Sequence, residues 1–348
     1  MKKILILTLV LCFLCTFFTG CNDNRTTLNI YNWEDYIDET VIDEFEKEYP
    51  EIKINYERFI TNEDMYNKVT KSNATYDLLF PSDYMIEKMI RENLLAKIDF
   101  NNIPNYQLID EKFKNLDFDP QNEYSVPYMW GTLGILYNKK IVDEKEITWD
   151  VLFGDKYQGQ ILMMDSVRDA MGASLKSLGY SLNTDNPKEI EKAKEKLINH
   201  KKIILAYGFD DIKDKMVAEE AAVALVYAGD ALYAMNQNPD LAYAVPSEGS
   251  NLFFDSMVIP ANSPHKKEAE LFIDFMCRTD IAKKNADYIE YYSVQKEAAE
   301  QIEAENKNPE FMYPGDEKPE NWEIFKCLDS DVLELYNQAW TEVTTTTD

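Results

Sequence analysis

Aromatic rings and carboxylates stand next to one another at several points where an apolar run of the sequence ends. The groups are Trp33-Glu34-Asp35-Tyr36, Ser82-Asp83-Tyr84, Tyr227 with Asp230, Phe253-Phe254-Asp255 and Tyr291-Tyr292. Taken singly, an aromatic residue beside a strand usually packs in a core, and a loop aspartate usually forms a turn or caps a helix. Because the combination recurs, we interpret these groups as the lining of one ligand crevice, beyond the carboxyl ends of strands in an open α/β sheet.

Outside these groups, few residues could perform catalysis. The chain has two histidines, His200 and His265, and we expect both at the surface. The GxSxG, HExxH, P-loop and GxGxxG motifs do not occur in the sequence. The alternating acids of residues 117–125 lack the glycine and the glutamate that an EF-hand loop requires. The residues therefore favour binding over catalysis, and they predict neither a cofactor nor a metal site.

The charge of the chain limits what the crevice could bind. With 36 basic and 63 acidic residues, the formal net charge is −27. Such a surface repels nucleic acids and anionic lipid headgroups, and it raises the local concentration of cations. Acidity also keeps many proteins soluble without any ligand. The charge thus permits a cationic ligand but does not establish one.

The first residues have the pattern of an export signal. Lys2 and Lys3 precede an apolar run over residues 4–18, and Thr19-Gly20 lead to Cys21. This ending resembles a bacterial lipoprotein box, although Phe18 stands where the box usually has leucine. We expect cleavage before Cys21 and lipidation of its thiol, with simple secretion or an uncleaved anchor as the alternatives. The protein would then lie at the outer face of the cytoplasmic membrane, extracellular or periplasmic.

The cysteines do not predict a disulfide framework. Cys12 and Cys15 belong to the expected signal peptide, so that only Cys277 and Cys327 would lie in the folded part. Isolated cysteines of this kind are usually small buried side chains. A bridge between the two remains open at this point.

Alternating strand-like and helix-like segments predict an α/β fold of two lobes. The roughly 328 residues after the signal suffice for two cores, and we expect helices to cover a largely parallel sheet. The lobes would have to be joined by strands that cross between them. The expected strands are 27–31, 52–56, 76–82, 159–165 and 221–229. The expected helices are 39–49, 62–69, 84–93, 187–199 and 266–278.

Several long segments resemble the bacterial spermidine/putrescine-binding proteins of polyamine ABC transporters. They include LNIYNWEDYIDE, YDLLFPSDYMIEKMI, FDPQNEYSVPYMWGTLGILYN and FFDSMVIPANSPHKKEAELFIDFM, in the order that the family has them. The likeness extends over nearly the whole chain after the signal. It implies a two-lobed fold like that of type II periplasmic binding proteins, with the ligand in the cleft between the lobes.

The resemblance also implies where the lobes lie along the chain. Residues 1–20 would be the signal peptide and 21–26 a lipidated linker. The first lobe would comprise 27–132 with 256–320, and the second lobe 133–255 with 321–343. Residues 344–348 would form a disordered tail.

The implied ligand explains why acids and rings stand together. A polyamine is a row of ammonium groups spaced by methylenes. Carboxylates supply charge-assisted hydrogen bonds to the ammonium groups, and ring faces shelter the methylenes while adding cation–π attraction of about 0.5–2 kcal/mol. By similarity to the family's pattern, the expected ligand residues are Trp33, Asp35, Tyr36, Ser82, Tyr84, Asp169, Tyr227, Asp230, Phe253, Asp255, Tyr291 and Glu323.

Departures from the family's pattern leave the preferred polyamine open. Ser166 stands where spermidine-type members have an extra aspartate, and Tyr227 stands where tryptophan is usual. Glu323 falls where spermidine binders have glutamine. Asp230 follows as in putrescine-binding members, where it would either hold one end of a diamine or cap the helix after Tyr227. Segments such as TNEDMYNKV look more like the spermidine branch.

Three functions remain in competition at the level of sequence. The first is a lipid-anchored receptor, monomeric, that passes a polyamine to an ABC permease and its cytoplasmic ATPase. The second is a ferric-ion binder of similar build, because adjacent tyrosines such as Tyr291-Tyr292 are ligands that iron uses. The third is an extracellular hydrolase that uses paired acids such as Asp35 and Asp169. We expect no nucleic-acid partner.

Overall fold

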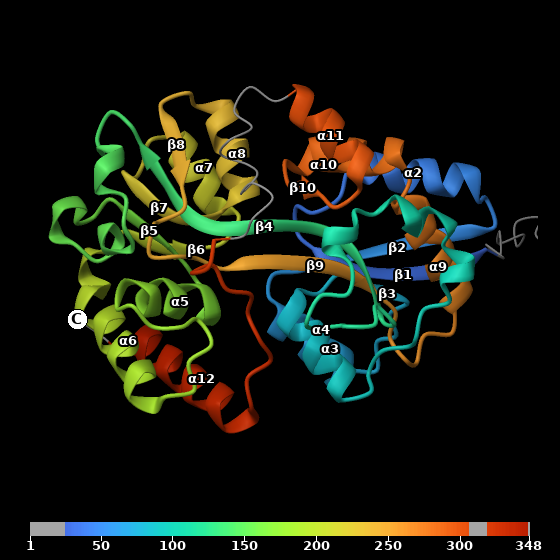
Figure 1. Cartoon of the computed structure of the whole chain (residues 1–348), viewed down its shortest axis with the longest axis horizontal. Helices are drawn as coiled ribbons and strands as arrows, with labels where there is room; N and C mark the ends of the chain where they lie inside the picture. Colours follow the sequence, from blue (N-terminus) through green and yellow to red (C-terminus); the bar gives the residue numbers. More distant parts are fainter. Residues whose placement is uncertain (1–24, 306–318, 347–348) are drawn as a thin grey trace, which may run out of the picture.

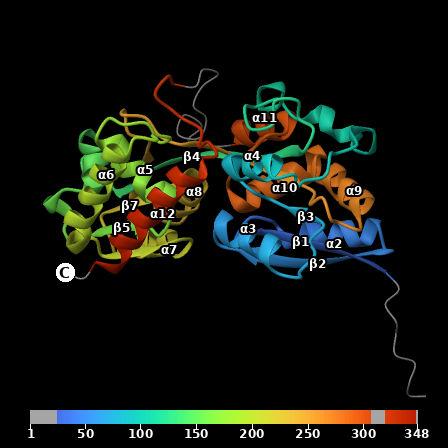
Figure 2. The same ribbon diagram turned by 90° about the horizontal axis from the view of Figure 1, so that it is seen from below.

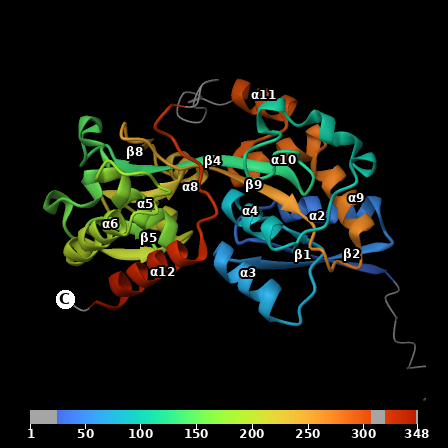
Figure 3. The same ribbon diagram turned by 60° about the horizontal axis from the view of Figure 1, so that its bottom comes forward.

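The computed structural model describes residues 25–305 and 319–346 and shows two halves joined by long strands (Figure 1). The expected signal peptide and Cys21 lie outside these residues. In Figure 1 the first half is on the right and the second half on the left, and the two also lie side by side when the molecule is turned (Figures 2 and 3). Among the described residues, no helix is both long enough and apolar enough to cross a membrane.

The first half contains both early and late parts of the chain. Its strands are β1 (Thr26–Trp33), β2 (Ile52–Phe59), β3 (Leu78–Leu79) and β10 (Tyr292–Ser293). Its α-helices are α2 (Glu39–Glu48), α3 (Asn62–Lys71), α4 (Asp83–Arg91), α9 (Lys266–Met276), α10 (Thr279–Ile289) and α11 (Lys296–Glu305). Short 3-10 turns lie at Phe100–Asn102, Pro104–Leu108 and Glu111–Phe113. The rings of Phe45 and Phe272 meet edge to face in the core, which fixes α9 against α2.

The second half is built from the middle and the end of the chain. Its strands are β5 (Ile161–Met164), β6 (Ala206–Gly208), β7 (Val223–Tyr227) and β8 (Leu241–Ala244). Its α-helices are α5 (Val167–Ser177), α6 (Pro187–His200), α7 (Asp211–Val217), α8 (Ala228–Gln237) and α12 (Ser330–Thr345). Short 3-10 turns lie at Glu144–Glu146, Trp149–Leu152, Asp155–Tyr157 and Lys201–Ile203.

Two strands, β4 (Ser125–Asn138) and β9 (Leu252–Val258), connect the halves. They pair antiparallel from Ser125↔Val258 to Thr132↔Leu252, and the rest of β4 continues into the second half to pair with β7 and β8. Every residue of β4 is buried. At Gly131 a Cβ atom would lie 2.7 Å from the ring of Phe253, so glycine lets that ring pack against the crossing strand.

The sheet of the described residues is mixed, which corrects the expectation of a largely parallel sheet. Its ten strands run in the order β2-β1-β3-β9-β4-β7-β5-β6, with β8 and β10 also on β4. Pairing is parallel within each half, for β1 with β2 and β3, and for β5 with β6 and β7. It is antiparallel around the crossing strands, because β4 leaves the first half and β9 returns to it.

Most expected elements form, and their ends follow local chemistry. Helix α2 begins after Asp38, whose carboxylate accepts a hydrogen bond from the Thr40 N–H. The strand expected over 76–82 is reduced to the two residues of β3, since Pro81 has no N–H to donate to a ladder. The strand expected over 221–229 ends at Tyr227, because Ala228 and Gly229 already belong to α8.

The C-terminal end of the chain differs from the tail that the sequence predicted. The tail expected to begin at 344 is wrong for Thr344 and Thr345, which belong to α12. Their hydroxyls donate to the carbonyls of Trp340 and Thr341, and Val343 beside them is fully buried. Residues 347–348 lie outside the described part.

The structure also answers the question of a disulfide bridge, because Cys277 and Cys327 are both free thiols.

Candidate ligand-binding site

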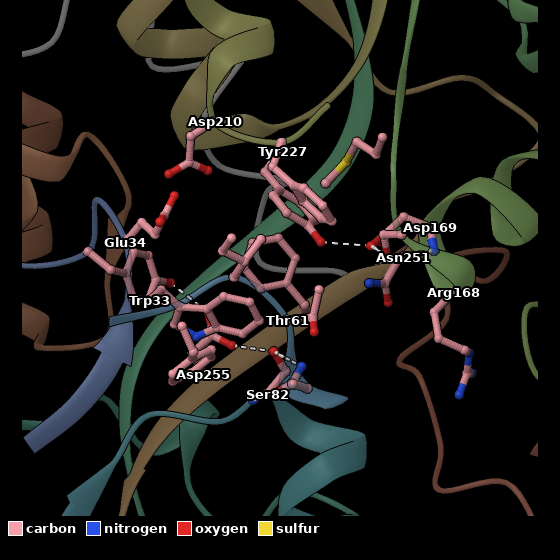
Figure 4. A pocket seen from close by; sticks show the side chains of 18 of the residues that line it. Trp33, Glu34, Thr61, Ser82, Arg168, Asp169, Asp210, Tyr227, Asn251 and Asp255 are labelled. Atoms are coloured by element: carbon pink, nitrogen blue, oxygen red, sulfur yellow. Dashed lines mark hydrogen bonds between the residues drawn. The ribbon is translucent and has the colours of Figure 1, made fainter. Parts of the chain in front are cut away.

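One pocket is lined by residues from both halves, and the groups singled out in the sequence meet there (Figure 4). Trp33 stands at the end of β1, Tyr227 at the end of β7, and Asp255 within the crossing strand β9. Every expected ligand residue except Glu323 contributes to its lining. The expected ligand residues that line this pocket are Trp33, Asp35, Tyr36, Ser82, Tyr84, Asp169, Tyr227, Asp230, Phe253, Asp255 and Tyr291.

Asp255 lies in the pocket beside Ser82 (Figure 4) and is only 4% exposed. The hydroxyls of Ser82 and Tyr36 each donate to its carboxylate at 2.6 Å. Burial raises the pKa of Asp255 to about 6, although the two hydroxyls act in the opposite direction. No basic side chain of the described residues pairs with this carboxylate, so it is held in place by neutral donors and lacks a counter-charge.

Asp169 is a second buried carboxylate that accepts hydrogen bonds from hydroxyl groups. It belongs to the first turn of α5, and its Oδ2 accepts hydrogen bonds from Ser166 at 2.5 Å and from Tyr227 at 2.7 Å. Burial raises its pKa, and the two hydroxyls, together with the neighbouring Arg168 guanidinium, partly offset this. Its Oδ1 has no hydrogen-bond partner among the described residues. This oxygen is free to accept from a ligand.

Asn251, which the sequence did not single out, lies next to Asp169 in the pocket (Figure 4). Its side chain is 2% exposed, and its Oδ1 also has no partner within the described chain. A buried polar atom without a hydrogen bond costs free energy, about 1–3 kcal/mol. Two unused acceptors at one end of a pocket therefore suit a ligand that brings N–H donors.

The opposite end of the pocket is more acidic, and a lysine that is not itself in the lining pairs with two of its acids. Figure 4 shows Glu34 and Asp210 at this end, away from Asp169. Lys213 Nζ, from α7, lies 3.1 Å from Asp35 and 3.4 Å from Asp230. Burial raises the pKa of Asp210 to about 7, and Asp230 adds to the effect while Lys213 opposes it. Burial would lower the pKa of Lys213, but Asp230, Asp210 and Asp35 raise it above its usual value.

Aromatic rings form the walls between these polar groups. The Trp33 indole donates its N–H to the Phe80 carbonyl at 2.7 Å and packs against Phe59 in a tilted arrangement, with ring centroids 4.5 Å apart. On the other wall, Phe253 packs against Tyr227 with ring centroids 5.1 Å apart. The Tyr291 ring fits against α8 because Gly229 there has no Cβ. The ring planes are thus fixed by packing and hydrogen bonds.

Glu323 lies outside the pocket lining, unlike the position that the resemblance implied. Its carboxylate contacts the Lys176 ammonium and the Ser181 hydroxyl, and it accepts from the Leu182 N–H at 3.2 Å. Partial burial would raise the pKa of Glu323, but Lys176 and Ser181 lower it. These contacts join the segment before α12 to the second half.

Asp230 does not cap α8, which was one of the two readings of this residue. The helix begins after Tyr227, and no side chain accepts from its first N–H groups. The Asp230 carboxylate instead contacts Lys213 and accepts from the Tyr291 hydroxyl at 3.4 Å.

The two neighbouring tyrosines of the iron hypothesis point to different places. Tyr291 lines the pocket, while Tyr292 lies in β10 and packs on Trp130 with ring centroids 4.8 Å apart. The pair therefore cannot ligate one ion together. No cluster of three or more His, Cys, Asp or Glu side chains suited to a metal occurs in residues 25–305 and 319–346.

Comparisons with known proteins give one consistent result. Residues 40–312 match the family described as bacterial extracellular solute-binding protein. The spermidine/putrescine-binding periplasmic protein of Escherichia coli K12 is 34% identical over 320 residues, which is 91% of this chain and 92% of that protein. The putrescine-binding periplasmic protein SpuD of Pseudomonas aeruginosa is 27% identical, with 92% of each chain covered.

Solved structures agree with the sequence matches. A structure from Listeria monocytogenes ascribed to a spermidine/putrescine ABC transporter has a TM-score of 0.86 and 40% identity, and the match covers 92% of this chain and 99% of that one. The Tp0655 (TpPotD) lipoprotein of Treponema pallidum has a TM-score of 0.81 and 30% identity, with 91% and 99% covered.

Proposed function

Because the chain belongs to the family of bacterial extracellular solute-binding proteins, we propose that it captures a polyamine between its two halves and delivers it to an ABC importer. Members of this family bind solutes for transporters and are not enzymes, so the hydrolase hypothesis is dropped. Spermidine and putrescine are the ligands named for the relatives.

The observation that carries the proposal is a pair of buried carboxylates that form no ion pair within the described residues, although the Arg168 guanidinium in the same lining acts on Asp169 from a distance. Asp255 and Asp169 accept hydrogen bonds from hydroxyls, and no basic side chain in the described part of the chain forms an ion pair with either. Leaving an ionised carboxylate buried without a counter-charge is costly, and the raised pKa values of both groups express this cost. A ligand with two or more ammonium groups supplies the missing charges.

The walls suit the remainder of such a ligand. A polyamine exposes methylene groups between its charges, and Trp33, Phe253 and Tyr291 contribute aromatic rings to the pocket lining. Ring faces attract the neighbouring ammonium groups by about 0.5–2 kcal/mol. We assign ligand contact to the lining residues predicted from the sequence and add Asn251 to them, whereas Glu323 is assigned a structural role.

Delivery requires that the protein stay close to its importer. We propose that Cys21 carries the lipid and that the mature protein is held at the outer face of the cytoplasmic membrane as a monomer. The lipoprotein-box pattern before Cys21 supports this, and the Treponema relative is named a lipoprotein. An anchored receptor meets its permease at high effective concentration, so it needs little intrinsic affinity for it.

Titration calorimetry tests the function directly. Putrescine, cadaverine, spermidine and spermine are titrated into the protein, with 1,4-butanediol as a control that has the length of putrescine but no charge. We expect at least one polyamine to bind with a Kd in the micromolar range or below, and no heat from the diol. If all four polyamines fail to bind at millimolar concentration, the proposed function is wrong.

A further inference from the structure

Lys213 is a nearly buried lysine whose ammonium lies between two acids of the pocket. It is 9% exposed, and its Nζ lies 3.4 Å from the Asp230 carboxylate and 3.1 Å from that of Asp35. Asp230 is itself largely buried, with 16% of its side chain exposed, whereas 69% of the Asp35 side chain is exposed. Lys213 is not itself part of the lining, and its ammonium acts on the site through contact with these two lining acids.

The acids of the pocket differ in whether the chain already gives them a cation. Asp230 and Asp35 share Lys213, while Asp169 and Asp255 are hydrogen-bonded to hydroxyls. Figure 4 places Asp169 on the side of the pocket opposite Asp210, whereas Asp255 lies below Asp210, beside Ser82. Asp169 and Asp255, which form no ion pair with a basic side chain of the described residues, thus lie apart from Asp210 in the pocket.

We propose that Lys213 is a specificity-determining residue, which supplies one cation of the cleft from the protein itself and so disfavours a triamine relative to a diamine. The inference rests on the proposed polyamine function and concerns the same pocket. A diamine has two ammonium groups for Asp169 and Asp255. The third ammonium of a triamine that extends along the pocket reaches the end where Lys213 is fixed.

The physical reason is repulsion between like charges in a poorly solvated place. Two positive charges several ångströms apart repel appreciably at the effective dielectric constant of a protein near its surface. The ligand's third ammonium would also find one oxygen of Asp230 and one of Asp35 already hydrogen-bonded to Lys213. Glu34 and Asp210 attract cations at this end, but burial beside Asp230 raises the pKa of Asp210 to about 7, so near neutral pH it supplies less than a full charge.

The test compares the affinities of putrescine and spermidine in wild type and in Lys213→Met, which keeps the length of the side chain and removes its charge. We expect the ratio of the two dissociation constants to move about tenfold in favour of spermidine. Lys215→Met is the matched control, because Lys215 lies on the same helix but pairs with Asp211, which does not line the pocket. It should leave the ratio unchanged.

Two further variants show whether a changed ratio of affinities comes from the lost charge or from misfolding. Lys213→Gln can still hydrogen-bond to the neighbouring carboxylates and should move the ratio in the same direction. Lys213→Arg keeps the charge and should keep the wild-type ratio. Thermal unfolding of each variant identifies any that do not fold.

The outcomes separate this inference from the function on which it rests. If wild type binds neither ligand, the polyamine function itself is wrong. If wild type binds and folded Lys213 variants change both affinities equally, Lys213 does not select between ligands, and the inference is overturned. An equal gain in affinity for both ligands would mean that either ligand displaces Lys213. An equal loss in affinity for both would mean that Lys213 only holds the halves together.

Discussion

The hydroxyl of Tyr36 donates a 2.6 Å hydrogen bond to the carboxylate of Asp255, although 219 positions separate the two residues in the sequence. Tyr36 lies in the loop between β1 and α2, and Asp255 lies in the strand that returns from the second half. The hydrogen bond fixes the direction of the carboxylate before any ligand is present. Such preorganisation lowers the free energy that binding must spend on ordering the site.

Replacing Asp255 by asparagine should weaken polyamine binding strongly and leave the fold intact. A buried ammonium would lose its ionised partner, which costs about 2–5 kcal/mol. Tyr36→Phe should cost only about 1 kcal/mol, because the carboxylate remains and loses one neutral donor. Calorimetry measures both affinities, and thermal unfolding checks the fold. A change of less than threefold for folded Asp255→Asn would show that Asp255 is structural.

Asn251→Ala should weaken binding without weakening the folded protein. The side chain has an unpaired, buried Oδ1, so its removal relieves a desolvation cost in the unliganded state. In the complex the same oxygen would accept from the ligand, and we expect a loss of about 1 kcal/mol in binding. Denaturant unfolding and calorimetry are compared for wild type and variant. A clear loss of stability with unchanged affinity would contradict this assignment.

Binding should strengthen as the pH rises from 5 to 7.5. Burial raises the pKa of Asp255 to about 6, so this carboxyl takes up a proton in the unliganded protein below that pH. An ammonium favours the ionised form, and binding near pH 6 should therefore release protons. Calorimetry in two buffers with different ionisation enthalpies measures this release. Asp255→Asn should reduce it, and an identical release in the variant would assign the protons to other groups.

The same linkage between proton binding and folding predicts how the stability of the unliganded protein changes with pH. A carboxyl with a raised pKa binds a proton more tightly in the folded than in the unfolded state, where its pKa is about 4. Its contribution to stability is therefore larger at pH 5 than at pH 7. A saturating polyamine should reduce or reverse this trend, and thermal unfolding at the two pH values checks both statements.

Trp33 should report closure of the pocket around a ligand. Its indole lines the site and is only partly buried. We expect a polyamine to change the intrinsic fluorescence and to raise the melting temperature by mass action. Trp33→Leu should remove most of the optical change. Persistence of the full signal in that variant would assign it to another of the five tryptophans.

Cys21 should carry lipid in the mature protein. Cells fed a radiolabelled fatty acid should label the wild-type protein and not Cys21→Ser. The variant should appear in the soluble extracytoplasmic fraction or remain as the uncleaved precursor. Equal labelling of both proteins would refute the assignment.

The sequence predicted the α/β class and most of the site because the relevant residues stand together. In the NWEDY segment, the end of the strand, the ring of Trp33 and the acids are adjacent, so the local pattern contains the information. The mixed sheet was missed because the direction in which β4 and β9 pair depends on the path of the whole chain. Local patterns do not encode that path.

Residues that act through distant partners could not be predicted in this way. Lys213 belongs to a segment, DDIKDKMV, whose charges look like a solvated helix face, and its partner Asp35 is 178 positions away. Glu323 was expected in the site, but its position depends on Lys176, which is 147 positions away. Asn251 is a single amide before a strand, and nothing in its neighbours marks it.

The ribbon of β4 and β9 has a mechanical consequence. With fourteen residues at about 3.3 Å each, β4 is roughly 45 Å long. Its pairing with β9 makes it stiffer within the plane of the sheet. A ribbon of two strands bends easily only out of that plane. We therefore expect any closing movement of the halves to follow mainly this one direction of bending. Different ligands that fit the pocket would lead to the same closed outline, so the importer can respond to a shape while the pocket alone decides which solute produces it.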